Sequence, residues 1–400
     1  MGDPSTTSPP RPGRLESVDL LRGVVMVIMA LDHVRDFWWS GLMVGIDPVN
    51  PSQTTVPLFF TRWITHYCAP TFIFLAGTSA FLMRSRGKSR AELAWFLFTR
   101  GLWLAFFEAV INRFFWIFSF DFHVHGAGVF WAIGWSMVVL SWLVFLPTWA
   151  VTAFGVVMIT LHNAFDPVTA QQLHLPDWLW GILHAGGKNP VVQDVTFETG
   201  YCLIPWMGVM AAGYGFGSIL QLDPAARRQR LLHLGATLTL LFFIVRLANV
   251  YGDLHPWTIQ RSNVYTFLSF LNCHKYPPSL CYLLMTLGPA ILFLAIFDRP
   301  LGPIAKPIIV FGRVPMFYYI LHIPLIHGGA VLYDYIAYGW SPLIYPYDPQ
   351  TGRSLPENYG FGLPMIYAIW IIVLLILYPL CRWYAGVKQR HRDNVWLSYL

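Results

Sequence analysis

Long apolar runs constrain most strongly what this chain can fold into. About ten stretches of roughly twenty mainly apolar residues follow one another, each long enough to cross a bilayer as a helix. Only 12% of the residues are charged and 56% are hydrophobic, whereas soluble domains carry about 25% charged residues. The sequence therefore predicts an all-α, polytopic transmembrane helical bundle in a lipid bilayer. In such a protein the net charge of +6 reflects loop orientation and does not indicate a nucleic-acid partner.

The apolar runs give approximate positions for the spans. One further segment, 174–185, contains Pro176 and two tryptophans and is predicted to be an interfacial or re-entrant helix instead. The predicted spans are 17–39, 56–83, 93–118, 127–146, 148–164, 199–221, 231–252, 279–298, 307–330 and 362–385.

The basic residues favour one orientation of this bundle. Most of them lie in the tails and in every second connection, as in the run 84–90 and the run 227–230, while the alternate connections hold few. The positive-inside rule then predicts an even number of spans and two cytoplasmic termini. We expect a disordered cytoplasmic tail over 1–14, a single transmembrane domain over 15–386 and a cytoplasmic C-terminal tail over 387–400.

The five cysteines are scattered along the chain without the paired spacing of a metal site. We therefore expect no metal ion, and we expect most of the cysteines to serve as small apolar residues. Cys273 and Cys281 flank a proposed outer loop and stay open as a disulfide pair.

The first span carries ionisable side chains inside an apolar segment. Arg22 and His33 are eleven residues apart, and at about 100° per residue they share one helix face with Met26 and Met29. Charged groups in a membrane helix usually face a partner, a cavity or a substrate path. An arginine and an imidazole about 16 Å apart on one face indicate anion binding coupled to acid/base chemistry.

His33 has two carboxylates close by in sequence. Asp36, one helical turn further on, is positioned to accept a hydrogen bond from a ring nitrogen of His33, and Asp32 is its direct neighbour. Such a contact would orient His33 as a general base and raise its basicity. The alternative is that Asp32 and Asp36 only mark the outer interface of the helix.

Other polar groups inside the predicted spans are candidates for the same site. Asp19 is three residues before Arg22 and can pair with it, and Arg313 enters a later span that also contains a deep histidine. For each group a structural network, or snorkelling in the case of the lysine, is the alternative to substrate contact. The candidates for substrate binding are Glu108, Arg113, His66, Lys275 and His322.

Several motifs resemble those of a known family. The opening RLESVDLLRG at 14–23 with MALDH at 29–33, the segment 70–77, KYPPSL at 275–280 and GRVP at 312–315 with His322 are similar to the heparan-α-glucosaminide N-acetyltransferase-like membrane proteins of bacteria. The spacing from Arg22 to His33 is also similar to the motif of the related acyltransferase-3 family. These blocks span the chain after residue 14.

The resemblance implies a transmembrane acyltransferase that takes an acetyl group from acetyl-CoA at the cytoplasmic side. Carried over to this chain, His33 would be the catalytic base and Arg22 would help to hold the donor. Asp19 and Arg313 are further candidates for donor binding from their charge and position. In the lysosomal animal enzyme an asparagine stands where His33 lies, so the acyltransferase-3 motif supports His33. We expect the acceptor to be an amine or hydroxyl of a sugar or glycan outside the cytoplasm.

Several alternatives remain open at this point. An acyl-histidine intermediate and direct transfer are both compatible with the residues. A proton-coupled small-molecule transporter would also place His, Asp and Arg near the midplane, although the chain shows no repeat of its halves. A purely structural membrane protein would show no ligand. We expect an integral protein of the bacterial cytoplasmic (inner) membrane, with a homodimer left open.

Overall fold

The structure is a computed structural model that describes residues 15–192, 195–345, 350, 352, 354–356 and 358–391. The predicted tail 1–14 and the part of the C-terminal tail from 392 to 400 lie outside the described residues. The described chain is mostly helical, in agreement with the predicted class.

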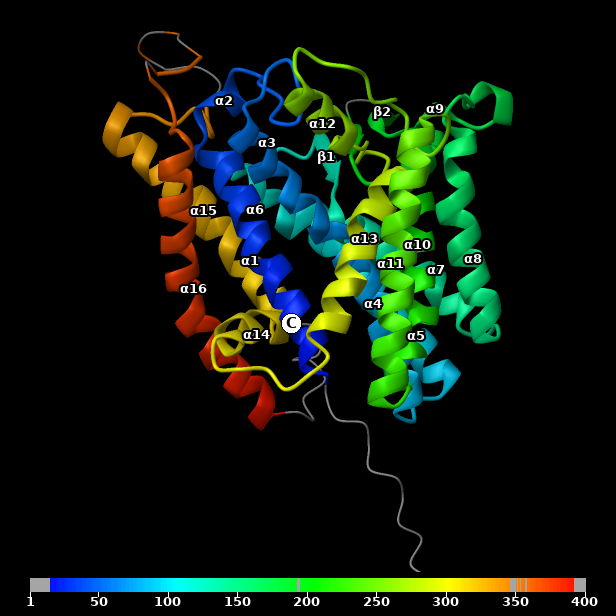
Figure 1. The fold of residues 1–400 in the computed structure, drawn as a ribbon. Coiled ribbons are helices and arrows are strands. Elements are labelled where there is room, and N and C mark those ends of the chain that lie inside the picture. The colour runs from blue at the N-terminus through cyan, green and yellow to red at the C-terminus, as the bar shows by residue number, and fades with distance from the viewer. Residues whose placement is uncertain are drawn as a thin grey trace, which may run out of the picture.

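Each of the ten predicted spans contains a helix (Figure 1). Short 3-10 and π-helical turns, labelled η, extend several of the α-helices. The helices are α1 (Glu16–Trp38), α2 (Ser40–Met43), α3 (Val56–Trp63), η1 (Ile64–Tyr67), α4 (Cys68–Ser85), α5 (Arg90–Phe106), η2 (Phe107–Asn112), α6 (Arg113–Ile117), α7 (Val129–Leu143), α8 (Thr148–Leu161), η3 (His162–Phe165), η4 (Gln171–Leu173), α9 (Asp177–Trp180), η5 (Gly181–Ala185), α10 (Leu203–Phe216), η6 (Ile219–Gln221), α11 (Pro224–Ala248), α12 (Asn263–Leu271), α13 (Leu280–Ile296), α14 (Ala305–Arg313), α15 (Pro315–Tyr338) and α16 (Leu363–Arg390).

Within the described residues, seven helical segments are long and apolar enough to cross a membrane. The helices α7 and α13 are apolar but shorter, and α1 carries more charge than such a segment usually has. The seven segments are Val56–Ser85, Arg90–Ile117, Thr148–Phe165, Leu203–Gln221, Pro224–Ala248, Pro315–Tyr338 and Leu363–Arg390. The chain is thus an integral membrane protein built from helices.

A small sheet lies at one end of the helical bundle, where the all-α prediction had no strands. Strands β1 (Val124–Ala127), β2 (Gly187–Val192) and β3 (Val195–Thr199) form it in the order β1-β3-β2. β1 pairs with β3 in parallel, and β2 pairs with β3 antiparallel. The strands are four to six residues long, too short for the alternating pattern that would have revealed them. The segment predicted as interfacial, 174–185, holds α9 and η5 just before β2.

The span predicted over 307–330 is divided in two. Helix α14 ends at Arg313, Val314 leaves the helical region with φ −132° and ψ 51°, and α15 begins at Pro315. Proline lacks an N–H and disfavours helical geometry at the residue before it, so the break follows from the sequence at this position. Arg313 and His322 therefore lie on different helices.

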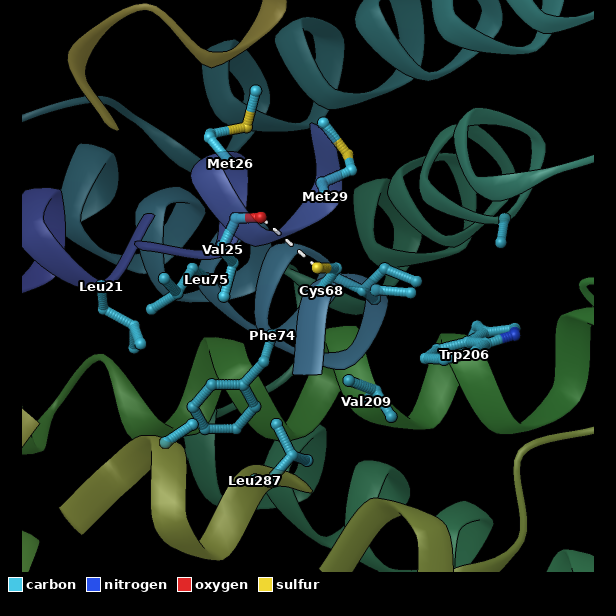
Figure 2. Close-up of a cluster of buried hydrophobic side chains, with 14 of the residues drawn as sticks. Leu21, Val25, Met26, Met29, Cys68, Phe74, Leu75, Trp206, Val209 and Leu287 are labelled. Atoms are coloured by element: carbon cyan, nitrogen blue, oxygen red, sulfur yellow. Dashed lines mark hydrogen bonds between the residues drawn. The ribbon is translucent and has the colours of Figure 1, made fainter. Parts of the chain in front are cut away.

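The helices enclose a continuous apolar core, part of which is shown in Figure 2. On α1 the carbonyl of Val25 accepts a hydrogen bond from the thiol of Cys68, at 3.4 Å, and Phe74 and Val209 pack in the same cluster. All five cysteines are buried and free. The disulfide that the sequence left open between Cys273 and Cys281 is therefore not formed, and both buried thiols lie close to Asp253 and Arg246.

Two glycines bring α1 and α14 into backbone contact. A Cβ atom on Gly23 would lie 2.0 Å from the carbonyl oxygen of Ile308, and one on Gly312 would lie 1.9 Å from that of Asp19. Only glycine permits backbones to approach this closely. The contact carries Arg313, the next residue, to the N-terminal end of α1.

Candidate active site

The first turns of α1 and the end of α14 form a group of three charged residues, which we call the arginine cluster: Asp19, Arg22 and Arg313. Asp19 lies 3.7 Å from Arg22 and 3.8 Å from Arg313, measured between carboxylate oxygen and guanidinium nitrogen. Arg22 also donates hydrogen bonds to α4, to the hydroxyl of Ser79 and the carbonyl of Leu75. The structure thus brings together the three residues that the sequence predicted to hold an anionic donor.

In the arginine cluster the carboxylate is buried and the two guanidinium groups are partly exposed. The side chain of Asp19 is 2% exposed, whereas those of Arg22 and Arg313 are 23% and 41% exposed. One carboxylate cannot neutralise two guanidinium groups, so the cluster carries a net positive charge at the surface. Guanidinium groups so placed are suited to phosphate oxygens.

Eleven residues along α1, His33 lies against a second histidine. Its Nδ1 is 2.7 Å from Nε2 of His322 on α15, and the two rings stack with centroids 4.9 Å apart. His33 and His322 are both buried. The two histidines, which the sequence predicted separately, form one pair that we call the histidine pair.

The hydrogen bonds of the histidine pair define its tautomers. Nδ1 of His322 contacts the carbonyls of Tyr319, at 2.8 Å, and Tyr318, at 3.2 Å. Because carbonyls only accept, His322 carries its proton on Nδ1, and its Nε2 must accept from Nδ1 of His33. The remaining nitrogen of neutral His33, Nε2, then bears a lone pair, and none of the described residues donates a hydrogen bond to it. That nitrogen is free to accept a proton.

Aromatic rings enclose the histidine pair. Trp116 and Tyr319 stand edge-on to the His33 ring, with centroids at 5.1 Å and 6.2 Å. Tyr319, three residues before His322, also packs against Phe130 at 4.4 Å. These walls limit the access of water to His33, which strengthens electrostatic effects there.

Glu108 lies behind this aromatic wall, in the π-helical turn η2. Its carboxylate accepts hydrogen bonds from Asn112 and from the backbone N–H of Phe130, both at 3.0 Å. π-helical turns occur frequently at functional sites. The buried Glu108 therefore has its own hydrogen-bond partners and does not contact the histidine pair through any bond between described residues.

The carboxylates next to His33 have different partners from those expected. Asp32 contacts Arg35 at 2.8 Å and also pairs with Arg62, and Asp36 contacts Arg35 at 2.6 Å. We call these four residues the carboxylate network. Arg35 lies between the two aspartates in sequence and draws both of them away from the imidazole. His322, and not Asp36, is the hydrogen-bond partner of His33.

Lys275, His66 and Tyr276 surround the carboxylate network. Lys275 is half-buried and close enough to Asp32 and His66 for electrostatic interaction. The buried His66 has no hydrogen-bond partner for its Nδ1 among the described residues. Although burial opposes the shift, Lys275 and Arg62 lower the pKa of the Tyr276 phenol. Sequence reasoning did not select Arg62 or Tyr276, although Arg62 stands one turn before His66 in an apolar span.

Arg113 has a role different from substrate contact in this arrangement. Its guanidinium donates to the backbone carbonyls of Val124, at 2.8 Å, and Ser119, at 3.0 Å, and lies 4.8 Å from the ring centroid of Phe122. It thus holds the segment between α6 and β1 in place. Among the described residues, Arg113 forms no hydrogen bond or ion pair with the histidine pair.

Comparison with known proteins places the chain in a family. A family model described as heparan-alpha-glucosaminide N-acetyltransferase, catalytic, matches residues 14–248, which is more than half of the 400 residues. No curated protein matches the chain. The matched region includes Arg22 and His33 on α1 but ends before Lys275, Arg313 and His322. The chain belongs to this family of transmembrane acetyltransferases, and the match does not favour a transporter.

Proposed function

We propose that this member of the heparan-alpha-glucosaminide N-acetyltransferase family moves an acetyl group across the membrane. The donor would be acetyl-CoA at the cytoplasmic face, and the acceptor an amine or hydroxyl of a sugar or glycan on the other side. The single observation that carries the proposal is the hydrogen bond between His33 and His322, because His33 lies on α1, the helix that also carries Asp19 and Arg22 of the arginine cluster. A proton acceptor and an anion-binding group are thus linked by one rigid element.

The proposed topology has ten spans, a single domain over 15–386 and both termini in the cytoplasm of a bacterial cell. The start of α1 and the end of α16 lie at the same end of the bundle (Figure 1). The start of α5, which follows the basic run 84–90, lies at that end as well, and so does the start of α11, which contains the basic run 227–230. This distribution of positive charge supports a cytoplasmic assignment for that end.

At the cytoplasmic end, the arginine cluster would bind the phosphate groups of the donor. Arg22 and Arg313 supply guanidinium groups for charge-assisted hydrogen bonds, and the buried Asp19 fixes their positions. The acyl-bearing arm would then run along α1 towards His33. Met26 and Met29, which lie between the two groups, are buried in the apolar core; their unbranched, adaptable side chains would have to move aside to admit the arm.

At the histidine pair, Nε2 of His33 would remove the proton from the attacking amine or hydroxyl. The acceptor forms a bond to the thioester carbonyl carbon, the carbon–sulfur bond breaks, and the thiolate of CoA leaves and takes up the proton that His33 received. His322 holds His33 in the tautomer that this step needs. The same lone pair would serve for an acyl-histidine intermediate, in which His33 itself attacks the carbonyl.

The acceptor would be held by the polar groups around His33. The carboxylate network, Lys275 and His66 offer donors and acceptors for sugar hydroxyls, and Glu108 offers a buried carboxylate on the other side of the aromatic wall. Asp32 and Asp36 would then position the acceptor together with Arg35 and Arg62. Arg113 would contribute only by holding the segment between α6 and β1 in place.

Acetyl-CoA binding to the purified protein tests the donor site. We expect saturable binding to the wild type, weakened in Arg22→Ala and largely kept in His33→Ala. Absence of binding to folded wild-type protein would overturn the proposal. Equal loss in both variants would contradict the assignment of separate roles to the two residues.

Transfer to two simple acceptors tests the chemistry. Labelled acetyl-CoA is supplied with glucosamine, which offers an amine, or with N-acetylglucosamine, which offers only hydroxyls. Labelled product with glucosamine alone identifies an N-acetyltransferase, and product with both identifies an O-acetyltransferase activity. No product with either, from protein that binds acetyl-CoA, would count against a simple amino-sugar acceptor.

A further inference from the structure

A second group of ionisable side chains lies at the far end of α8, apart from the histidine pair. His162 and Asp166 are four residues apart, at the start and just after the end of the turn η3, and His184 belongs to η5. One potential ligand atom from each of the three lies within 4.8 Å of the others, and Nε2 of His184 is 3.1 Å from a carboxylate oxygen of Asp166. We call these residues the His–Asp–His cluster.

Two imidazoles of this cluster are buried with nitrogens that have no partner. His162 is 1% exposed and His184 is 2% exposed. Within the part of the chain that the structure describes, three ring nitrogens have no hydrogen-bond partner: both nitrogens of His162 and Nδ1 of His184. Buried polar groups are nearly always satisfied in folded proteins. The unpartnered nitrogens therefore indicate that something other than these side chains binds here.

The carboxylate of the cluster is held in position from behind. The second oxygen of Asp166 accepts a hydrogen bond from the amide of Asn163 at 2.9 Å. The amide oxygen of Asn163 in turn accepts from the backbone N–H of Leu280, at the start of α13, at 2.9 Å. Outer hydrogen bonds that fix ligand side chains in this way are typical of metal sites.

We propose that His162, Asp166 and His184 bind one divalent transition-metal ion of the Zn²⁺ class. Two imidazoles and one carboxylate suit such ions, whereas Ca²⁺ and Mg²⁺ prefer oxygen ligands throughout. Neighbouring ligands of a tetrahedral Zn²⁺ stand roughly 3.3 Å apart, given bonds of about 2.0 Å. The three ligand atoms, which lie within 4.8 Å of one another, would move closer together on binding the ion.

This site differs from the sequence-based expectation of no metal. That expectation rested on cysteine spacing, whereas the cluster contains no cysteine. Its pattern, His162 followed by Asp166 four residues later and by His184 eighteen residues after that, begins at the end of one predicted span and extends into the connection that follows it. Only the folded chain brings the three together.

The bound ion would stabilise one end of the bundle. It would join the end of α8 to the segment that leads into β2, and through Asn163 to the start of α13. In Figure 1 the end of α8 lies at the edge of the molecule near α9, away from α1 and α15. We therefore assign the ion a structural role that does not depend on the proposed transferase activity.

Metal binding to the purified, chelator-treated protein tests this inference. We expect about one Zn²⁺ per chain by elemental analysis, a visible absorption band when Co²⁺ replaces it, and a higher unfolding temperature with the metal. Alanine at His184 should abolish all three. His123→Ala is the matched control, because His123 is an exposed histidine in a neighbouring loop and should bind metal as the wild type does.

A conservative variant covers the case in which His184→Ala does not fold. Asp166→Asn keeps the size of the side chain and should lower Zn²⁺ affinity at least about tenfold. No uptake of Zn²⁺ by the wild type overturns the inference. It is equally overturned if Asp166→Asn and His184→Ala, both folded, take up as much Zn²⁺ as His123→Ala.

Discussion

The two ends of α1 hold charged groups in different ways. At the N-terminal end, the arginine cluster is joined by ion pairs of 3.7 and 3.8 Å, and Arg313 is 41% exposed. At the C-terminal end, contacts are shorter: His33 and His322 are 2.7 Å apart, and Arg35 lies 2.8 Å from Asp32 and 2.6 Å from Asp36. The side chain of Arg35 is only 4% exposed. The same helix thus carries a partly exposed group of charges at its N-terminal end, which we call the open end, and a buried group at its C-terminal end, which we call the closed end.

The difference matches what each end is proposed to do. Arg22 and Arg313 lie 3.7 and 3.8 Å from Asp19 and are partly exposed, so their guanidinium groups can exchange Asp19 for phosphate oxygens while Arg22 keeps its hydrogen bond to Ser79. A proton acceptor, by contrast, works best when its orientation and tautomer are set before the substrate arrives. Variants at the two ends should therefore fail in different ways: those at the open end in donor binding, those at the closed end in turnover or stability.

The largest effect is expected for His33→Ala. Loss of the general base should lower transfer by about 10²- to 10⁴-fold, while acetyl-CoA binding stays near the wild-type value. Steady-state transfer and equilibrium binding, measured on the same preparation, check both statements. Wild-type turnover in this variant would remove His33 from the mechanism.

Asp32→Asn should cause the next largest effect, on stability. It leaves Arg35 and Arg62 without a full counter-charge in a largely buried position, and breaking such a pair costs about 3–5 kcal/mol. Thermal unfolding in detergent measures the change. Asp36→Asn is the matched control, since Asp36 contacts only Arg35 within this network, and its loss should cost clearly less. Equal destabilisation by the two variants would contradict the central place of Asp32.

A smaller loss is expected for His322→Ala. His33 keeps its imidazole but loses the partner that sets its tautomer, so turnover should fall by about 10- to 100-fold, with little change in donor binding. His327→Asn on the same helix provides the comparison, because His327 contacts the carbonyl of Phe115 and not His33. If both variants lose turnover equally, the effect is one of helix packing and not of the histidine pair.

The smallest effect is expected at the open end. Arg313→Ala should weaken acetyl-CoA binding by about tenfold, or about 1.4 kcal/mol, because the arginine is partly exposed and Arg22 remains. The loss should shrink as the salt concentration rises. Arg382→Ala, at an exposed arginine on α16, should bind the donor like the wild type. A similar loss in both variants would indicate a general charge effect.

Local patterns predicted much of the open end and less of the closed end. The helical stripe of Arg22 and His33 depends only on the repeat of a single helix, and the ion pair of Asp19 with Arg22 depends on a spacing of three residues. The contact of His33 with His322 joins residues 289 positions apart. Each histidine could be selected from its apolar surroundings, but their pairing depends on how two helices pack.

The expectations that differ from the structure have local physical reasons. Asp36 was expected to orient His33, but Arg35 competes for the same carboxylate with a full charge. The span over 307–330 was predicted to be continuous, although Pro315 was a visible signal for a break at Val314. The strands are too short to show an alternating pattern. Arg62 was visible in an apolar span but needed its contact with Asp32 to be recognised.

The unbroken helix α1 fixes the distance between Arg22 and His33. Arg22 and His33 are about 16 Å apart along its axis, and no loop between them can stretch or shorten that distance. A donor can therefore bind productively only if the distance from its phosphates to its reactive carbonyl matches the fixed distance from Arg22 to His33. Inserting a single residue between them would turn His33 by about 100° away from His322. This stretch of α1 should tolerate substitution far better than any change in its length.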